Sequence, residues 1–120
     1  MLMKALELYP ERKIHFDIVQ VGAGGNGGYI TQRLAKLLSS LNRMEVNSEF
    51  TYTIVDLDLV EEKNLQRQPF LPKDIGKNKA KVLAERYGKA YQFPIFHREE
   101  YVESLEELRN CFASGYDNFV

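Results

Sequence analysis

Apolar side chains alternate and then run together over residues 14–21, and the run ends directly in a cluster of glycines. This pattern is typical of a buried parallel strand that leads into a tight turn. From Asn26 onward, apolar residues recur at steps of three and four positions, which predicts a helix with one apolar face ending near Asn42. A polar loop over residues 43–49 and a second strand over residues 50–55 follow, because the latter segment is rich in β-branched and aromatic residues. Together these segments predict a βαβ unit.

The second half of the chain has a less regular pattern. Residues 56–73 show no sustained period and contain two prolines, which predicts an ordered loop with one short turn near residues 62–66. Helical spacing returns over residues 77–91, and a short strand is expected over residues 94–97. A last helix is predicted over residues 104–112, where a serine is followed three residues later by a glutamate, the capping-box pattern.

Strands and helices that alternate in this way predict an α/β fold, a Rossmann-like βαβ domain with a mainly parallel sheet. The chain has 120 residues, enough for one small domain, and no linker or repeat divides it. Residues 116–120 read as the start of a further strand. We therefore expect residues 1–120 to be the N-terminal part of a single, truncated domain.

Composition excludes several classes of partner. The chain is 44% apolar and 28% charged, with a formal net charge of -1, so it lacks the clustered positive charge that nucleic-acid binding requires. Its apolar runs are far shorter than the roughly 20 residues that cross a bilayer, and its first residues do not resemble a secretory signal. The single cysteine, Cys111, cannot form an internal disulfide or a metal cluster. We expect a cytoplasmic protein that binds neither nucleic acid nor membrane, and no metal site among these residues.

The glycine cluster is the first candidate for chemistry. Gly22, Gly24 and Gly27 form G-x-G-x-x-G between a predicted strand and a predicted helix, the context in which such a turn binds nucleotide phosphates. The first glycine would allow the tight turn, the second would let the main chain approach a phosphate, and the third would allow close helix packing. Gly25 is an additional glycine within the motif. The alternative is that these glycines only make a turn.

Polar residues after the second strand complete a candidate nucleotide site. Asp56 comes at the carboxyl end of that strand, where an open α/β sheet places the acid that binds ribose hydroxyls. We interpret Asp58 as a solvated residue that caps the next turn. The side chains predicted to contact phosphates and the nucleotide are Asn64, Gln66, Arg67 and Lys79. The alternative for each is a solvated surface side chain.

The order of these motifs resembles the ubiquitin-activating-enzyme-like superfamily, the group of ThiF, MoeB and HesA. The matching segments are Asp56-Leu57-Asp58-Leu59-Val60, Asn64-Leu65-Gln66-Arg67-Gln68 and Asp74-Ile75-Gly76-Lys77-Asn78-Lys79. The resemblance implies ATP-dependent adenylation of the C-terminal carboxylate of a ubiquitin-like or sulfur-carrier protein. It also implies that Gly25 lies against the nucleotide, that Asp56 holds the ribose, and that Asn64, Arg67 and Lys79 bind the phosphates, with Arg67 and Lys79 as catalytic residues.

The same resemblance implies further parts that this chain does not contain. The family's magnesium-binding aspartate would follow Val120, so Mg²⁺ is expected together with ATP, and the chain would supply only the ATP-binding half and be inactive alone. A homodimer is possible in this family, and Arg12 is the candidate for an arginine shared between subunits. Two alternatives stay open: an oxidoreductase domain that uses NAD or FAD, and a non-catalytic scaffold of the same fold. We expect Cys111 to be buried, and His15 and His97 to be structural.

Overall fold

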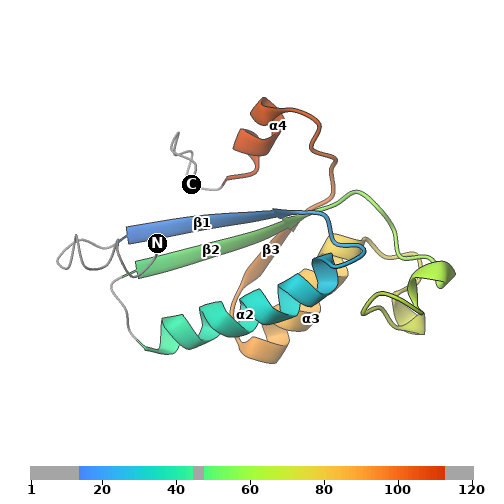
Figure 1. The fold of residues 1–120 in the computed structure, drawn as a ribbon, viewed down its shortest axis with the longest axis horizontal. Coiled ribbons are helices and arrows are strands. Elements are labelled where there is room, and N and C mark those ends of the chain that lie inside the picture. Colours follow the sequence, from blue (N-terminus) through green and yellow to red (C-terminus); the bar gives the residue numbers. More distant parts are fainter. Residues whose placement is uncertain (1–13, 45–47, 113–120) are drawn as a thin grey trace.

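The computed structural model describes residues 14–44 and 48–112. The expectations for Arg12 and for a strand over residues 116–120 lie outside the described residues. Three parallel strands form one open sheet in the order β1-β2-β3 (Figure 1). Their bounds are β1 Ile14–Val21, β2 Ser48–Val55 and β3 Ile95–Arg98.

Strand pairing places the carboxyl ends of all three strands at one edge of the sheet. Val21 pairs with Val55, and Val55 pairs with Arg98, the last residue of β3. The second strand begins two residues earlier than its composition predicts, because Ser48 pairs with the first residue of β1. The predicted α/β fold with a parallel sheet is confirmed.

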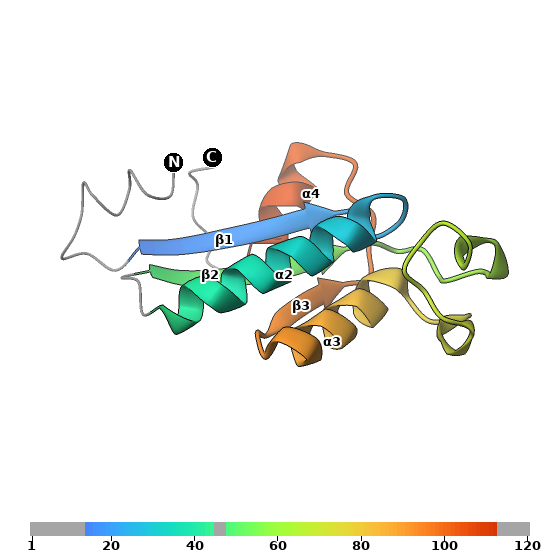
Figure 2. The same ribbon diagram turned by 60° about the horizontal axis from the view of Figure 1, so that its bottom comes forward.

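Two long helices cover one face of the sheet. They are α2, Gly27–Arg43, and α3, Lys79–Tyr91, while the short helix α4, Leu105–Asn110, lies over the opposite face (Figures 1 and 2). The core between the sheet and α2 and α3 includes side chains that are almost fully buried, namely Leu38, Tyr52, Ile54, Leu83 and Phe93. None of the described helices is both long enough and apolar enough to span a bilayer.

Side-chain caps set where two of the helices begin. Asn78 caps α3, because its Oδ1 accepts a hydrogen bond from the amide of Lys81 at 2.9 Å, and the helix therefore begins at Lys79, two residues later than predicted. Ser104 caps α4 as predicted and accepts from the amide of Glu107 at 3.1 Å. That helix ends at Asn110, two residues before its predicted end.

The segment between β2 and α3 is an ordered loop, as predicted, that extends beyond the carboxyl edge of the sheet (Figure 1). It contains two short 3-10 helices, Glu62–Asn64 and Pro72–Asp74. Val60 holds the loop together, because its amide donates to the carbonyl of Lys77 at 2.8 Å and its own carbonyl accepts from Gly76 at 2.9 Å. Val60 and Phe70 also pack into the core. The loop is thus anchored at both ends next to the glycine turn.

Candidate functional site

The turn between β1 and α2 requires glycine at two of the predicted positions. Gly22 has a φ of +105°, which side chains other than glycine rarely adopt, and its amide donates to the carbonyl of Val55 at 2.8 Å. A Cβ added to Gly27 would stand 2.7 Å from the carbonyl oxygen of Gly22. The tight turn and the close helix packing predicted for the first and third glycines are therefore confirmed.

A network of polar side chains is hydrogen-bonded to the main-chain carbonyl groups of this turn. The Gln20 side-chain amide donates to the carbonyl oxygens of Gly22 and Gly27 at 2.9 and 3.0 Å, and lies 3.1 Å from the hydroxyl of Thr31. The Tyr52 hydroxyl donates to the side-chain oxygen of Gln20, and burial raises the pKa of this phenol. This network was not predicted from the sequence. Its signal there is an amide side chain between two valines, directly before the glycines.

Asp56 is held against the turn by main-chain groups. Its Oδ2 accepts from the amide of Ala23 at 2.8 Å, and its Oδ1 accepts from the amide of Asp58 at 2.9 Å. A carboxylate has about four acceptor sites, so acceptor capacity remains after these two bonds. Asp56 therefore lies next to the turn, where a ribose acid was predicted.

Asp58 is exposed, as predicted, but it is not simply a capping residue. Its Oδ1 accepts a hydrogen bond from the hydroxyl of Tyr101 at 2.8 Å. Its main-chain oxygen accepts from the amide of Lys79 at 2.9 Å. This residue thus links the end of β2 both to the start of α3 and to the segment after β3, a role that the sequence did not reveal.

Lys79 is buried over the glycine turn. Only 7% of the residue is exposed, and its Nζ lies 3.2 Å from the point where a Cβ on Gly24 would stand. The side-chain oxygen of Gln68 lies 3.4 Å from the same point, and that oxygen is buried without a hydrogen-bond partner among the described residues. Within that part of the chain, the Lys79 ammonium has no hydrogen bond or ion pair. A cation without a partner at a glycine turn is suited to an anionic ligand, and the unpaired amide oxygen of Gln68 can accept a hydrogen bond from a donor group of a ligand.

The remaining predicted ligands have different environments. Asn64 is 6% exposed, and its Oδ1 accepts from the amide of Glu61 at 2.7 Å, so this side chain stabilises the loop. Gln66 and Arg67 are exposed, and neither side chain forms a hydrogen bond or ion pair with a residue that the structure describes. The structure therefore brings Asp56 and Lys79 to the turn but shows no contact between it and Arg67. Their roles toward a nucleotide stay predictions.

The acid of the third motif has a structural role. Both oxygens of Asp74 accept from Nη2 of Arg86, at 2.8 and 2.7 Å, and Oδ2 also accepts from the amide of Leu71 at 2.7 Å. Burial by itself would raise the pKa of Asp74, but the hydrogen bonds from Arg86 and Leu71 and the positive charge of Arg86 outweigh it. The pKa of Asp74 is consequently below its ordinary value. This ion pair fixes the loop to α3.

Cys111 is buried, as predicted, with 2% exposed. Burial, then the hydrogen bond from its thiol to Glu100 at 3.2 Å, raise its pKa to about 11, so the thiol is protonated and unsuited to nucleophilic attack at neutral pH. His15 lies in β1 and His97 in β3, each beside a glutamate. Within residues 14–44 and 48–112, no group of three or more His, Cys, Asp or Glu side chains could hold a metal ion.

Comparisons with known proteins agree with this geometry. A profile described as the ThiF family matches residues 11–117. Similar solved structures include two of the E. coli tRNA N6-threonylcarbamoyladenosine dehydratase TcdA, in complex with AMP and with ATP. Both are 28% identical, with TM-scores of 0.63 and 0.60, and the matches cover 94% and 89% of this chain. A search of curated proteins finds no match.

A second similar structure is that of E. coli MccB with AMPCPP and MccA. It is 25% identical to the chain, the match covers 78% of the chain, and the TM-score is 0.58. The chain spans only part of these proteins, covering 41% and 39% of the two TcdA chains and 26% of the MccB chain.

Proposed function

The chain belongs to the ThiF family, and on this premise we propose that it binds ATP at the turn between β1 and α2 as part of an enzyme that adenylates a carboxylate. The observation that supports this function most directly is Lys79, a residue only 7% exposed whose ammonium has no hydrogen-bond or ion-pair partner among the described residues and lies over Gly24. An ammonium that forms no ion pair within the described residues and lies at a glycine turn is suited to bind an anion. The triphosphate of ATP supplies that anion.

The other groups at the turn fit parts of the same ligand. Asp56 has remaining acceptor capacity for ribose hydroxyls. Gly24 and Gly25 let the main chain approach phosphate oxygens, and the amino end of α2 favours negative charge there. Arg67 is exposed on the adjoining loop, where a planar guanidinium could bind two phosphate oxygens once ligand is present. Asn64 and Gln66 are the further amide donors of this loop.

In the proposed reaction, a carboxylate oxygen attacks the α-phosphorus of ATP, a new bond forms between them, and the bond to the departing pyrophosphate breaks. Negative charge builds on the phosphoryl oxygens and on the pyrophosphate as this occurs. Lys79 and Arg67 would stabilise that charge more strongly than they stabilise bound ATP, which lowers the barrier. Mg²⁺, expected from the family resemblance, would add charge neutralisation. Within the described residues, no group of three or more His, Cys, Asp or Glu side chains could hold this ion.

The carboxylate would belong to a ubiquitin-like or sulfur-carrier protein. This part of the proposal rests on the family resemblance, and the MccB structure with MccA shows a relative crystallised with a second component. We also propose a cytoplasmic location and pairing into a homodimer. The chain by itself would bind nucleotide without completing the reaction, because it spans less than half of the similar enzymes.

Titration calorimetry with ATP and NAD in parallel tests the choice of ligand. We expect the chain to bind ATP more tightly than NAD, since the loop after β2 provides cations for three phosphates and a dinucleotide has only two. Tighter binding of NAD would favour the alternative oxidoreductase domain and contradict the proposal.

Pyrophosphate exchange into ATP tests catalysis in the complete protein that carries this segment. Exchange that depends on an added carrier protein with a free C-terminal carboxylate is the expected result. A protein that binds ATP but exchanges no pyrophosphate with any carrier tested would instead be the non-catalytic scaffold.

A further inference from the structure

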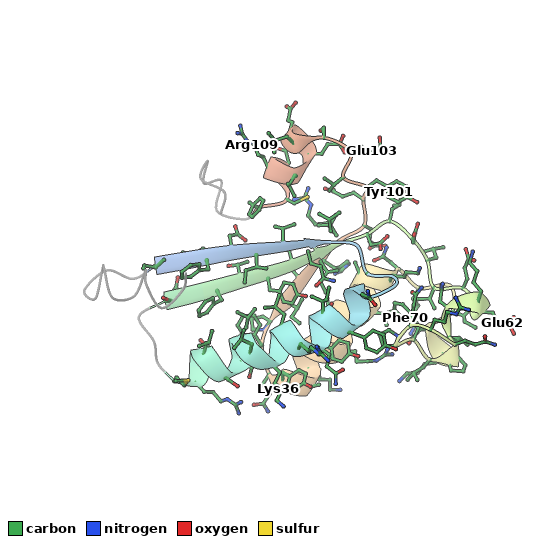
Figure 3. The ribbon with its side chains drawn as sticks, in the orientation of Figure 1. Lys36, Glu62, Phe70, Tyr101, Glu103 and Arg109 are labelled. Carbon is green, nitrogen blue, oxygen red and sulfur yellow. The ribbon has the colours of Figure 1, made fainter. Side chains whose placement is uncertain are left out.

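Tyr101 lies at the same edge of the sheet as the glycine turn, in the segment between β3 and α4 (Figure 3). Its hydroxyl donates to Oδ1 of Asp58 at 2.8 Å, a contact between residues 43 positions apart in the sequence. The ring is nevertheless 54% exposed. A large aromatic side chain is therefore held in a defined place while much of its surface remains open to solvent.

The order of the strands relates the position of Tyr101 to the proposed nucleotide site. Lys79 and Gly24 mark the phosphate side of the site, next to β1, and Asp56 marks the ribose side, at the end of β2. The end of β3 lies directly beside Asp56, because the Asp56 amide donates to the carbonyl of Arg98 at 3.1 Å. A nucleotide with its phosphates at β1 and its ribose at β2 continues toward β3. Tyr101 follows the end of β3 by three residues and is hydrogen-bonded to Asp58, two residues after Asp56, so it lies on this side of the site.

Asp58 contacts both Lys79, on the phosphate side of the site, and Tyr101, on the side of β3. Its main-chain oxygen accepts from the Lys79 amide, and its side chain accepts from Tyr101. The hydrogen bond to Asp58, followed by its negative charge, raises the pKa of the Tyr101 phenol. The ring thus stays neutral at physiological pH and keeps its donor. A neutral, oriented ring with an open face is suited to stacking on a planar, uncharged group.

We propose that Tyr101 is a nucleobase-binding residue, whose ring packs on the base of the bound nucleotide, and that Asp58 is the positioning residue that orients it. This inference rests on the proposed function, because it takes the phosphate and ribose sides of the site from it. It adds the third part of the ligand, the base.

The test compares variants in calorimetric titrations with ATP and with inorganic tripolyphosphate, which has no base. Tyr101→Ala should raise the Kd for ATP about tenfold, within the range measured for the loss of one base-stacking aromatic, and should leave binding of tripolyphosphate unchanged. Tyr101→Phe, which keeps the ring but not its hydrogen bond, should raise the Kd for ATP by only about twofold to threefold. Asp58→Ala, which removes the acceptor, should resemble Tyr101→Phe.

Phe96→Ala is the matched control, because Phe96 is exposed to a similar extent, 56%, but lies within β3 itself rather than in the segment after it. It should leave the ATP Kd unchanged. Equal ATP binding by the wild type and Tyr101→Ala would overturn the inference, and so would an equal loss of ATP and tripolyphosphate binding. Failure of the wild type to bind ATP at all would instead contradict the proposed function.

Discussion

Asp74 and Lys79 are two buried charged residues five positions apart in one motif, and their surroundings differ completely. Asp74 is 2% exposed and accepts three hydrogen bonds, two of them from Arg86. Lys79 is 7% exposed and has no side-chain partner among residues 14–44 and 48–112. Both positions match the family motif equally well, so the sequence alone does not distinguish their roles.

The difference follows from the cost of burying charge. A buried charge that is fully hydrogen-bonded belongs to the structure, because removing its partner leaves an uncompensated ion. A charge without a protein partner adds no pairing interaction to stability and is suited to a ligand that supplies the missing interaction. We therefore assign Asp74, at the acidic end of this motif, to folding, and Lys79, at its basic end, to ligand binding. Substitutions at the two ends should separate stability from binding.

The largest effect is expected for Asp74→Ala. It leaves the guanidinium of Arg86 unpaired and removes the acceptor for the Leu71 amide. The free energy of unfolding should fall by about 3 kcal/mol, the lower part of the range for breaking a buried pair, because Arg86 is 24% exposed. Denaturant unfolding followed by circular dichroism measures this change.

Lys63→Ala provides the matched control for this prediction. Lys63 pairs with Glu61 at 3.2 Å, but both side chains are mostly exposed. Its loss should change stability by less than about 0.5 kcal/mol. If Asp74→Ala were as harmless as Lys63→Ala, the acidic end of the motif would not be structural and the comparison would fail.

The second effect is on binding. Lys79→Met removes the charge while keeping most of the apolar stem, and it should raise the Kd for ATP by about tenfold to a hundredfold, the value of one or two charge-assisted hydrogen bonds. The melting temperature should stay nearly the same, because the lost ammonium has no hydrogen bond or ion pair within the described residues. Calorimetry and thermal unfolding of the same samples measure both quantities.

Lys81→Met serves as its control, since Lys81 is exposed in the same first turn of α3. It should alter neither ATP binding nor the melting temperature. A large loss of stability in Lys79→Met, with no change in ATP affinity, would reverse the assignment of the two ends.

Asp74 and Lys79 also illustrate which features of the fold and the site can be predicted from the sequence. The strands, the two long helices and the glycine turn could be predicted because each depends on local periodicity or on a backbone conformation that only glycine readily adopts. The position of Asp56 followed from the topology of parallel strands. These features are local, and the structure agrees with them apart from shifts of one or two residues at the ends of elements.

The remaining features depend on contacts between distant segments. The network of Gln20 with Tyr52 and the bond between Asp58 and Tyr101 join residues 32 and 43 positions apart. The pairing of Asp74 with Arg86 crosses from the loop to α3. Polar residues of this kind look like ordinary surface side chains in the sequence, because only the fold shows which partner each one has.

The smallest effect concerns acid stability and follows from the lowered pKa of Asp74. A carboxyl whose pKa is lower in the folded than in the unfolded chain binds protons more readily after unfolding, so it stabilises the fold above the unfolded pKa of about 4. That contribution is lost as the pH falls through the lower pKa of the folded state. The free energy of unfolding of the wild type should therefore decline more steeply below pH 4 than that of Asp74→Asn, which lacks the titrating group. Denaturant titrations between about pH 7 and pH 3 measure the two slopes, and parallel slopes would show that the Arg86 contact does not favour the ionised form of Asp74.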